Sequence, residues 1–354
     1  MSNIKEVAQR AGVSISTVSR VMNNSKRVSP ELAEKVRTVA FELGYNANQA
    51  AQSLRGAKSK RIAVIITSLS RTFFTSVLEG INKIADDCGY TILLAETHDD
   101  LTREIELVNN FVSQWVDGII LASSAYGKDQ FTRNYISSLA RLEKKGRRVP
   151  VVTLEYAFEH SDIDAVVIDS EKAAYHAVTY LIEQIGRRDI VHISLPSTHF
   201  MGRQRITGYL RALHDAGIPM RSDYIMQGDY TTYSGYRVVK LLIQTGKHFD
   251  AVFCANDQMA VGAILACNEC GVSIPDQVAI VGNDDIFAAS LVRPSLTSIQ
   301  VPKYELGMSA MLRLQERLEE DAPHRQRIVT LDTQFVERGS TLKGYQEDLK
   351  NLVW

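Results

Sequence analysis

The sequence predicts a small α-helical head followed by a larger α/β body with two parallel-sheet lobes. Three observations lead to this fold class. The chain of 354 residues is too long for one ordinary domain. Its first sixty residues carry ten Lys and Arg against four Glu, a net charge of +6 that leaves −7 for the remainder. From residue 61 onward, apolar runs typical of buried parallel strands alternate with amphipathic helical stretches.

The composition also limits the class of protein. At 45% hydrophobic and 23% charged residues, it is typical of a globular chain. No apolar run approaches the ~20 residues needed to cross a bilayer, and the N-terminus lacks the apolar core of a signal peptide. Four cysteines are too few for a disulfide framework. We therefore expect a cytoplasmic protein without a membrane partner.

The head is predicted to contain three short helices. Four apolar residues share one face of the first: Ile4, Val7, Ala8 and Ala11. Gly12 then permits a tight turn, and Ser14 or Ser16 is expected to cap the second helix. The run Ser29-Pro30-Glu31 is a strong start for a third helix that stops at Gly44. Two short helices at a tight turn, braced by a third, form a helix-turn-helix.

The second helix is predicted to read DNA, because such helices enter the major groove with their N-terminal residues at the base edges. The residues expected to contact DNA are Ser14, Ile15, Ser16, Thr17, Ser19, Arg20 and Asn23. Short hydroxyls let the backbone approach phosphates, and the fork of Arg20 suits O6 and N7 of guanine. A basic head supports this prediction, although a solvated charged surface would explain the charge alone about as well.

The head resembles the DNA-binding domain of the lactose/galactose repressor (LacI/GalR) family of bacterial transcription regulators. The resemblance lies in IKEVAQRAGVSISTVSRVMNN and VSPELAEKVRTVAFELGYNANQAAQSLRG. It implies a hinge helix over residues 48–55, with Leu54 as a wedge in the minor groove and Arg55 as its flanking cation. Helices this short are marginal in water, so we expect order only when two copies meet on bent DNA. A flexible linker is the alternative.

The resemblance continues through the body in FCANDQMAVGAI, VGNDD, PSLTSIQVP and VERGST. It implies two doubly wound parallel-sheet lobes similar to periplasmic sugar-binding proteins. The predicted divisions are a head at 1–46, a hinge and linker at 47–60, an effector-binding and dimerisation domain at 61–340, and a tail at 341–354. Within the body, the first lobe is predicted to comprise 61–160 and 293–324, and the second 161–292 and 325–340.

An effector site is predicted between the lobes, because ligands of open α/β sheets bind at the carboxyl ends of strands. Aromatic and polar residues that follow the predicted strands are the candidates: Phe73, Phe74, Ser123, Glu155, Tyr156, His199, Arg205, Tyr230, Asn256 and Asp284. By the resemblance, Arg205, Asn256 and Asp284 match effector-contacting positions, and Tyr230 falls where an aromatic stacks on the ligand. Flat apolar surface with planar hydrogen-bonding groups suits a polyhydroxylated ring.

Each site residue has a simpler alternative. Asn256 or Asp284 could merely cap the following helix, Arg205 could form a surface ion pair, and one of Phe73 and Phe74 should belong to the core. The family pattern also differs here in three places: Asn283 replaces an aromatic residue, Glu155 replaces aspartate, and His199 lies at a variable position. These departures bear on which effector is bound.

The resemblance implies a ligand-gated repressor of carbohydrate-utilisation genes, acting as a homodimer on a near-palindromic double-stranded DNA operator. A sugar or sugar phosphate is the first candidate for the effector and a purine or nucleoside the second, and a protein co-effector remains an open alternative.

The alternative functions are those of a transport receptor, a cytoplasmic sugar-binding protein without regulatory role, and an enzyme. No GxGxxG after the first strand, Walker, GxSxG or HExxH motif occurs. We therefore expect no catalysis, no metal and no cofactor, and interpret Cys267-Asn-Glu-Cys270 as packed core thiols.

Overall fold

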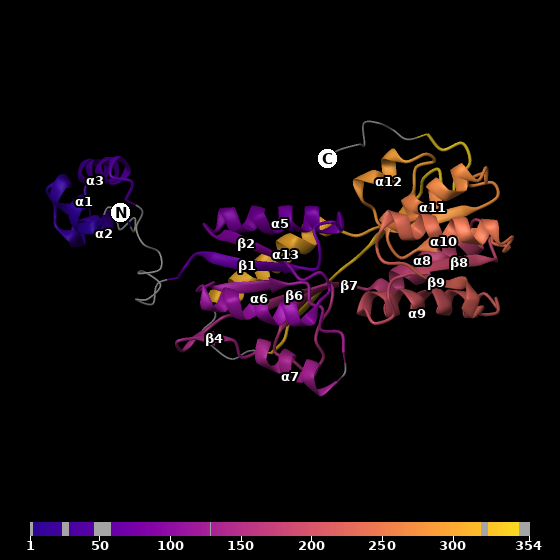
Figure 1. Cartoon of the computed structure of the whole chain (residues 1–354), viewed down its shortest axis with the longest axis horizontal. Helices are drawn as coiled ribbons and strands as arrows, with labels where there is room; N and C mark the ends of the chain where they lie inside the picture. The colour runs from indigo at the N-terminus through magenta and orange to yellow at the C-terminus, as the bar shows by residue number, and fades with distance from the viewer. Residues whose placement is uncertain (1–2, 23–27, 46–57, 128, 320–324, 347–354) are drawn as a thin grey trace. The chain divides into compact units, whose positions relative to one another are not determined.

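The computed structural model describes residues 3–22, 28–45, 58–127, 129–319 and 325–346, and the chain divides into two compact units, 1–59 and 60–354 (Figure 1). The first unit is the helical head and the second the α/β body, so the predicted fold class is confirmed. Asn23, Leu54 and Arg55, three residues predicted to contact DNA, lie outside the described residues. No described helix combines the length and hydropathy needed to cross a bilayer.

In the part of the head that the structure describes there are three helices: α1 (Ile4–Ala11), α2 (Ile15–Met22) and α3 (Pro30–Glu42). Gly12, at φ 69°, makes the turn between the first two. Ser14 caps α2, because its hydroxyl accepts a hydrogen bond from the Thr17 N–H at 3.1 Å, whereas Ser16 lies inside the helix. Ser29 precedes α3 as predicted, but its side chain makes no capping hydrogen bond. The helices enclose a small core: Val7, Ala8, Ala11, Val18, Val21, Val36 and Ala40.

The first lobe of the body is a six-stranded parallel sheet between two layers of helices. Its strands in spatial order are β13 (Ile328–Leu331), β7 (Asp164–Ile168), β6 (Val151–Leu154), β3 (Gly118–Leu121), β1 (Arg61–Ile66) and β2 (Thr91–Glu96). Helices α5 (Phe73–Asp87) and α13 (Lys303–Glu319) pack on one face, and α6 (Leu101–Ser113) and α7 (Gln130–Leu139) on the other. A small hairpin, β4 (Glu143–Lys144) and β5 (Arg147–Arg148), precedes β6.

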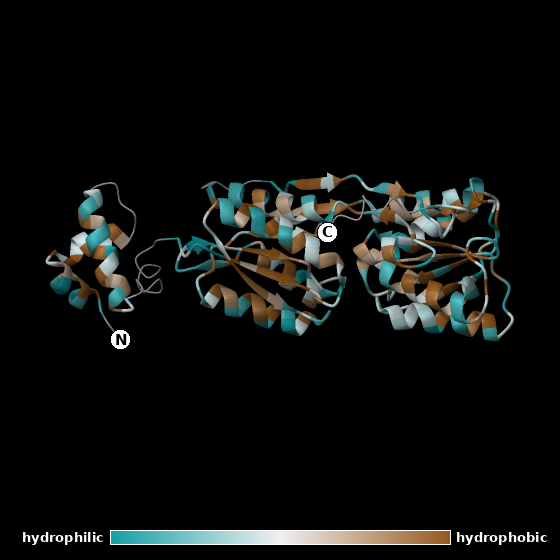
Figure 2. Cartoon of the chain, turned by 90° about the horizontal axis from the view of Figure 1, so that it is seen from above, coloured by the Kyte–Doolittle hydropathy of each residue, from teal (hydrophilic) through white to brown (hydrophobic). Residues whose placement is uncertain are grey.

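The second lobe repeats this plan. Its sheet runs β14 (Gln334–Val336), β12 (Thr297–Gln300), β11 (Ala279–Asp284), β10 (Ala251–Cys254), β8 (Ile190–Ser194) and β9 (Ile225–Gln227), with only β14 antiparallel. The covering helices are α8 (Ser170–Glu183) and α9 (Phe200–Asp215) on one face, and α10 (Thr232–Gln244) and α11 (Asp257–Glu269) on the other. A 3-10 turn (Ser222–Tyr224) and α12 (Phe287–Leu291) complete it. Figure 2 shows that apolar residues concentrate in the strands of both sheets.

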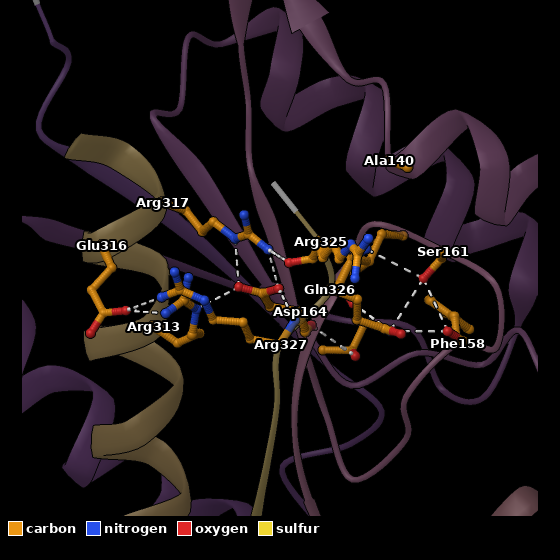
Figure 3. A network of polar contacts seen from close by, with 12 residues as sticks. Ala140, Phe158, Ser161, Asp164, Arg313, Glu316, Arg317, Arg325, Gln326 and Arg327 are labelled. Atoms are coloured by element: carbon orange, nitrogen blue, oxygen red, sulfur yellow. Dashed lines mark hydrogen bonds and ion pairs between the residues drawn. The ribbon is translucent and has the colours of Figure 1, made fainter. Parts of the chain in front are cut away.

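Three strands belong to the other lobe than predicted. β7 and β13 pair with each other in the first sheet, whereas β12 pairs with β11 in the second. The chain therefore crosses between the lobes after β7, β12 and β13 rather than near residues 161, 293 and 325. The apolar pattern of a strand does not reveal which sheet it joins. Ion pairs show the lobe to which β7 belongs. Buried Asp164 at the start of β7 binds Arg313 and Arg317 of α13, a helix that packs on the first sheet (Figure 3).

Helix α13 returns to the first lobe and packs against α5 through glycines. A Cβ on Gly307 would lie 2.0 Å from the Val77 carbonyl oxygen, and one on Gly80 would lie 2.1 Å from the Tyr304 carbonyl oxygen. Because both obstacles are backbone atoms, no rotamer change relieves the clash. The two helices can approach this closely only without side chains at these positions.

Gly307→Ala is therefore expected to lower the free energy of unfolding by about 1–3 kcal/mol, the usual cost of overpacking. Chemical denaturation of the full chain measures this change. Glu305→Ala, at an exposed position of the same helix, serves as the control and should change stability by less than ~0.5 kcal/mol. A Gly307→Ala protein as stable as the parent would show that the two helices are not in backbone contact.

Candidate DNA interface and inter-lobe pocket

The second helix of the head presents its predicted DNA-contacting face outward. Val18 and Val21 are buried in the head core, whereas Ile15 is 46% exposed and Arg20 is exposed. At the N-terminal end of α2, the Ser14 hydroxyl lies 2.8 Å from that of Ser16 and 2.9 Å from that of Thr17. Ser19 is half-buried on the same helix. The arrangement offers a row of small hydroxyl groups followed by one long cation, which suits phosphate and base contacts respectively.

The body contains a pocket between its two lobes, called here the inter-lobe pocket. Seven of the ten predicted effector residues line it: Phe73, Phe74, Glu155, Arg205, Tyr230, Asn256 and Asp284. Phe73, Phe74 and Glu155 come from the first lobe and the other four from the second, all at or beyond the carboxyl ends of strands. The free volume is about 30 Å³, room for about two water molecules.

Arg205 and Asp284 form the polar floor of the inter-lobe pocket. Arg205 is only 3% exposed, which excludes the surface ion pair considered above; its Nη2 lies 3.9 Å from Oδ1 of Asp284. Its Nη1 donates to the Ala255 carbonyl, while its buried Nε bonds no described atom. Burial raises the pKa of Asp284, and the charge of Arg205 opposes that rise. A buried guanidinium and a carboxylate that share one wall can bind paired hydroxyl or carbonyl groups of a ligand.

Asn256 both caps a helix and lines the inter-lobe pocket. Its Oδ1 accepts a hydrogen bond from the Met259 N–H at 3.0 Å and so caps α11. Its Nδ2 donates to the Tyr230 carbonyl at 3.1 Å, and the side chain lines the inter-lobe pocket. The capping interpretation and the pocket interpretation therefore describe the same residue. Its amide fixes the loop that carries Tyr230.

Aromatic rings form the apolar walls of the inter-lobe pocket. Phe73 and Phe74 meet edge to face with ring centroids 5.2 Å apart, and both belong to the core of the first lobe as well as to the pocket. The prediction that one of them belongs to the core therefore holds for both. Tyr230, at φ 72°, is held by His199, whose Nδ1 lies 2.8 Å from the phenol oxygen. Burial lowers the pKa of His199 and so favours its neutral ring.

Three predicted site residues do not line the inter-lobe pocket. Ser123 instead donates a 2.7 Å hydrogen bond to the buried carboxylate of Glu104. Tyr156 packs against Phe200, with ring centroids 4.2 Å apart. His199 contacts the Tyr230 hydroxyl and is not among the lining residues. Position after a strand places a residue near the cleft, but the rotamer decides which side chains reach it.

Sequence reasoning missed six lining residues: Thr67, Arg71, Tyr126, Leu195, Met201 and Gln258. Thr67, Arg71 and Tyr126 follow strands of the first sheet, so the strand-end rule applied to them as well. Leu195 and Met201 belong to the hydrophobic core of the second lobe. As apolar residues in the sequence, they indicated a buried core and not a ligand site. Within the described ranges, no cluster of three or more His, Cys, Asp or Glu could hold a metal ion.

Glu155 gives the inter-lobe pocket a pH-dependent charge. Burial raises its pKa from 4.5 to about 7; the nearby charge of Asp284 adds to the rise, and that of Arg205 opposes it. Between pH 4.5 and about pH 7, the folded protein therefore holds a proton on Glu155 that the unfolded chain has lost. Stability conferred by the protonated carboxyl is therefore present below pH 4.5 and is lost as the pH rises toward 7.

Glu155→Gln is expected to remove this loss and to raise the free energy of unfolding at pH 8 more than at pH 5. Urea denaturation at the two pH values measures the difference. Glu106→Gln, at an exposed position of the same lobe, should leave the pH profile unchanged. A parent protein whose stability does not fall between pH 5 and 8, relative to Glu155→Gln, would contradict the raised pKa.

Comparison with known proteins follows the division into head and body. Residues 3–48 match the family model of bacterial regulatory proteins of the lacI family, and residues 59–338 match that of periplasmic binding proteins and the sugar binding domain of the LacI family. The chain is 32% identical to the HTH-type transcriptional repressor PurR of Pectobacterium carotovorum, covering 97% of this chain and 98% of that protein. It is 35% identical to catabolite control protein A of Priestia megaterium, covering 87% and 90%.

Solved structures agree with this similarity. The lac repressor dimer bound to operator and the anti-inducer ONPF matches with a TM-score of 0.82 at 27% identity, covering 96% of this chain and 99% of that one. The complex of the transcriptional regulator CelR with cellobiose matches with a TM-score of 0.69 at 27% identity, covering 96% and 100%.

Proposed function

Because this chain belongs to the LacI family of bacterial regulatory proteins, we propose that a sugar or sugar phosphate bound in its inter-lobe pocket gates its repression of carbohydrate-utilisation genes. The chain is a DNA-binding transcriptional repressor that acts as a dimer on operator DNA under the control of a small effector. A dimer places two reading helices in successive major grooves of a near-palindromic operator. We further propose that it works in the cytoplasm by binding alone, with neither catalysis nor a cofactor.

One observation carries the proposal of a polyhydroxylated effector. Arg205, Asn256 and Asp284 bring planar donors and acceptors to one end of a pocket whose walls are the rings of Phe74 and Tyr230. Sugar rings have hydroxyl groups on their edges and apolar C–H faces, which this arrangement can bind together. A related regulator of the same fold binds cellobiose.

A purine or nucleoside is the second candidate, because four aromatic rings line the pocket: Phe73, Phe74, Tyr126 and Tyr230. A flat base could stack on these rings and place its N–H groups against Asp284. Sugars and purines make different demands on the pocket. A base needs a ring on its face, whereas a sugar needs more hydrogen bonds around its edge.

A thermal-shift screen with sugars, sugar phosphates and purines separates the two candidates. A ligand at ~100 times its dissociation constant adds about 2.7 kcal/mol to the stability of the folded protein. A sugar or sugar phosphate that raises the melting temperature and changes operator affinity would support the proposal. A response to purines alone would favour the second candidate. If the protein bound no DNA duplex, the assignment as a transcriptional regulator would be refuted.

Arg20→Ala is expected to relax the preference of the repressor for one base pair in each half-site, at a cost of about 1–3 kcal/mol, because the guanidinium fork suits guanine. Competition binding with a set of singly substituted operators measures this effect. Arg10→Ala, on the first helix of the head, is the matched control and should leave the sequence preference intact. If Arg20→Ala weakens binding to all sequences equally, Arg20 contacts phosphate rather than a base.

A further inference from the structure

Arg71 occupies the part of the inter-lobe pocket where a ligand would meet Tyr230. It lies between β1 and α5 of the first lobe, and its guanidinium carbon is 3.5 Å from the ring centroid of Tyr230 in the second lobe. Its Nη1 donates to the Thr67 hydroxyl at 2.8 Å and to Oδ1 of Asp99 at 3.2 Å, and its Nη2 forms a short ion pair with Oδ2 of Asp99. The contacts with Thr67 and Asp99 thus fix this side chain within the first lobe, and the contact with the Tyr230 ring crosses to the second.

The same loop makes a second contact between the lobes. Nε2 of Gln258, at the start of α11, donates to the Ser70 carbonyl at 3.2 Å. Ser70 and Arg71 together therefore attach the first lobe to two elements of the second. The Arg71 side chain is 15% exposed and that of Asp99 24%, so the ion pair and the ring contact are partly shielded from water, which strengthens both.

Arg71 also limits what can bind. A ligand ring that stacks on Tyr230 needs the space that the guanidinium fills, and the remaining free volume of about 30 Å³ is too small for a sugar or a purine. Displacing Arg71 breaks its contacts with Tyr230, Asp99 and Thr67. A ligand must replace these interactions, and hydrogen-bond donors directed at the Asp99 carboxylate would do so.

We propose that Arg71 determines effector specificity and holds the two lobes in a closed arrangement; this second role is called the latch. Its contact with Tyr230 holds the two lobes together. An effector can replace Arg71 only if it has a flat face that stacks on the Tyr230 ring and hydrogen-bond donors that reach the Asp99 carboxylate. The inference rests on the proposed function, because it concerns the same effector pocket. It adds that ligand entry is a competition with a side chain of the protein, so the affinity measured for any effector includes the cost of moving Arg71.

The latch is tested without a ligand, through the distance between the lobes in the full-length protein. Spin labels at Glu106 on α6 and Thr207 on α9, both exposed, report this distance by double electron–electron resonance. Dilution with unlabelled protein suppresses distances between protomers. Serine replaces the two half-buried cysteines, Cys88 and Cys270, so that labelling stays specific.

Arg71→Ala is expected to shift the distribution to longer and broader distances, and Arg71→Lys to give an intermediate shift, because lysine keeps the charge without the planar fork. Arg133→Ala, an exposed arginine of the same lobe, should leave the distribution unchanged. Distributions for Arg71→Ala and Arg71→Gln that coincide with that of the parent would overturn the latch, whether or not an effector is known.

Ligand titration then separates the latch from the proposed function. For a sugar, sugar phosphate or purine that binds the parent, Arg71→Ala is expected to bind at least fivefold more tightly and to discriminate less among related probes. Weaker binding by Arg71→Ala would overturn the inference, because it would make Arg71 a ligand contact. If no probe alters operator affinity in either protein while the lobe distance shifts, the proposed effector fails and the latch stands.

Discussion

Asp284→Asn is expected to abolish the effector response of the repressor while operator binding persists. The substitution keeps the shape of the side chain, and asparagine, like aspartate, adopts positive φ more readily than most residues, as the φ of 111° at this position requires. It removes the negative charge that faces Arg205 at 3.9 Å. Each ligand hydrogen bond to a charged group is worth about 1.5–3 kcal/mol, so effector affinity should fall by a factor of ten or more for each bond lost.

Operator binding with and without effector, followed by fluorescence anisotropy, measures this response. Asp285→Asn is a matched control, because Asp285 is adjacent in sequence but binds Arg338 and Gln300 instead. The control should keep its effector response. A normal response in Asp284→Asn would remove this carboxylate from ligand binding.

Asp164→Ala is expected to have the largest effect on stability of any substitution considered, a loss of about 3–5 kcal/mol, because it leaves two buried cations without their partner. Asp164 is fully buried and accepts hydrogen bonds from Arg313, Arg317 and the Arg327 N–H, the last at 2.8 Å (Figure 3). The carboxylate thus ties α13 and the start of β13 to β7.

Chemical denaturation at pH 7 measures this loss. Glu316→Ala, which removes an exposed partner of Arg313, should cost less than about 1 kcal/mol. Burial alone would raise the pKa of Asp164, but the hydrogen bonds from Arg317, the Arg327 N–H and Arg313 outweigh it and lower the pKa. The stabilisation is therefore present above the usual aspartate pKa of about 4 and is lost as the pH falls below it. An Asp164→Ala protein as stable as the parent would contradict the role of this network.

Local rules predicted most of the elements from the sequence. The helices of the head followed from apolar spacing together with the turn at Gly12 and the start at Pro30. The two sheets followed from apolar runs that alternate with helices. The assignment of β7, β12 and β13 to a lobe was wrong, because pairing between distant strands depends on partners that the local pattern does not contain. The lobe of β7 could have been inferred from Asp164 only if its ion pairs with Arg313 and Arg317 had been known.

The inter-lobe pocket was predictable in position but not in detail. Strand ends and the family resemblance placed Arg205, Asn256 and Asp284 in it. The rotamers that turn Ser123 toward Glu104, and His199 toward Tyr230, depend on packing across the lobe. The strand-end rule could have included Arg71, but its contacts with Asp99 and Tyr230 could not be predicted, because these residues are distant from it in sequence.

We propose that a small molecule held by Arg205 and Asp284 controls operator affinity. Measurement of both affinities on one preparation tests it most directly: effector binding to free protein and to the operator complex, and operator binding with and without saturating effector. Reciprocal coupling requires that the two ratios be equal. We expect equal ratios of at least fivefold, and a ratio of one in either titration, with the effector bound, would contradict the account.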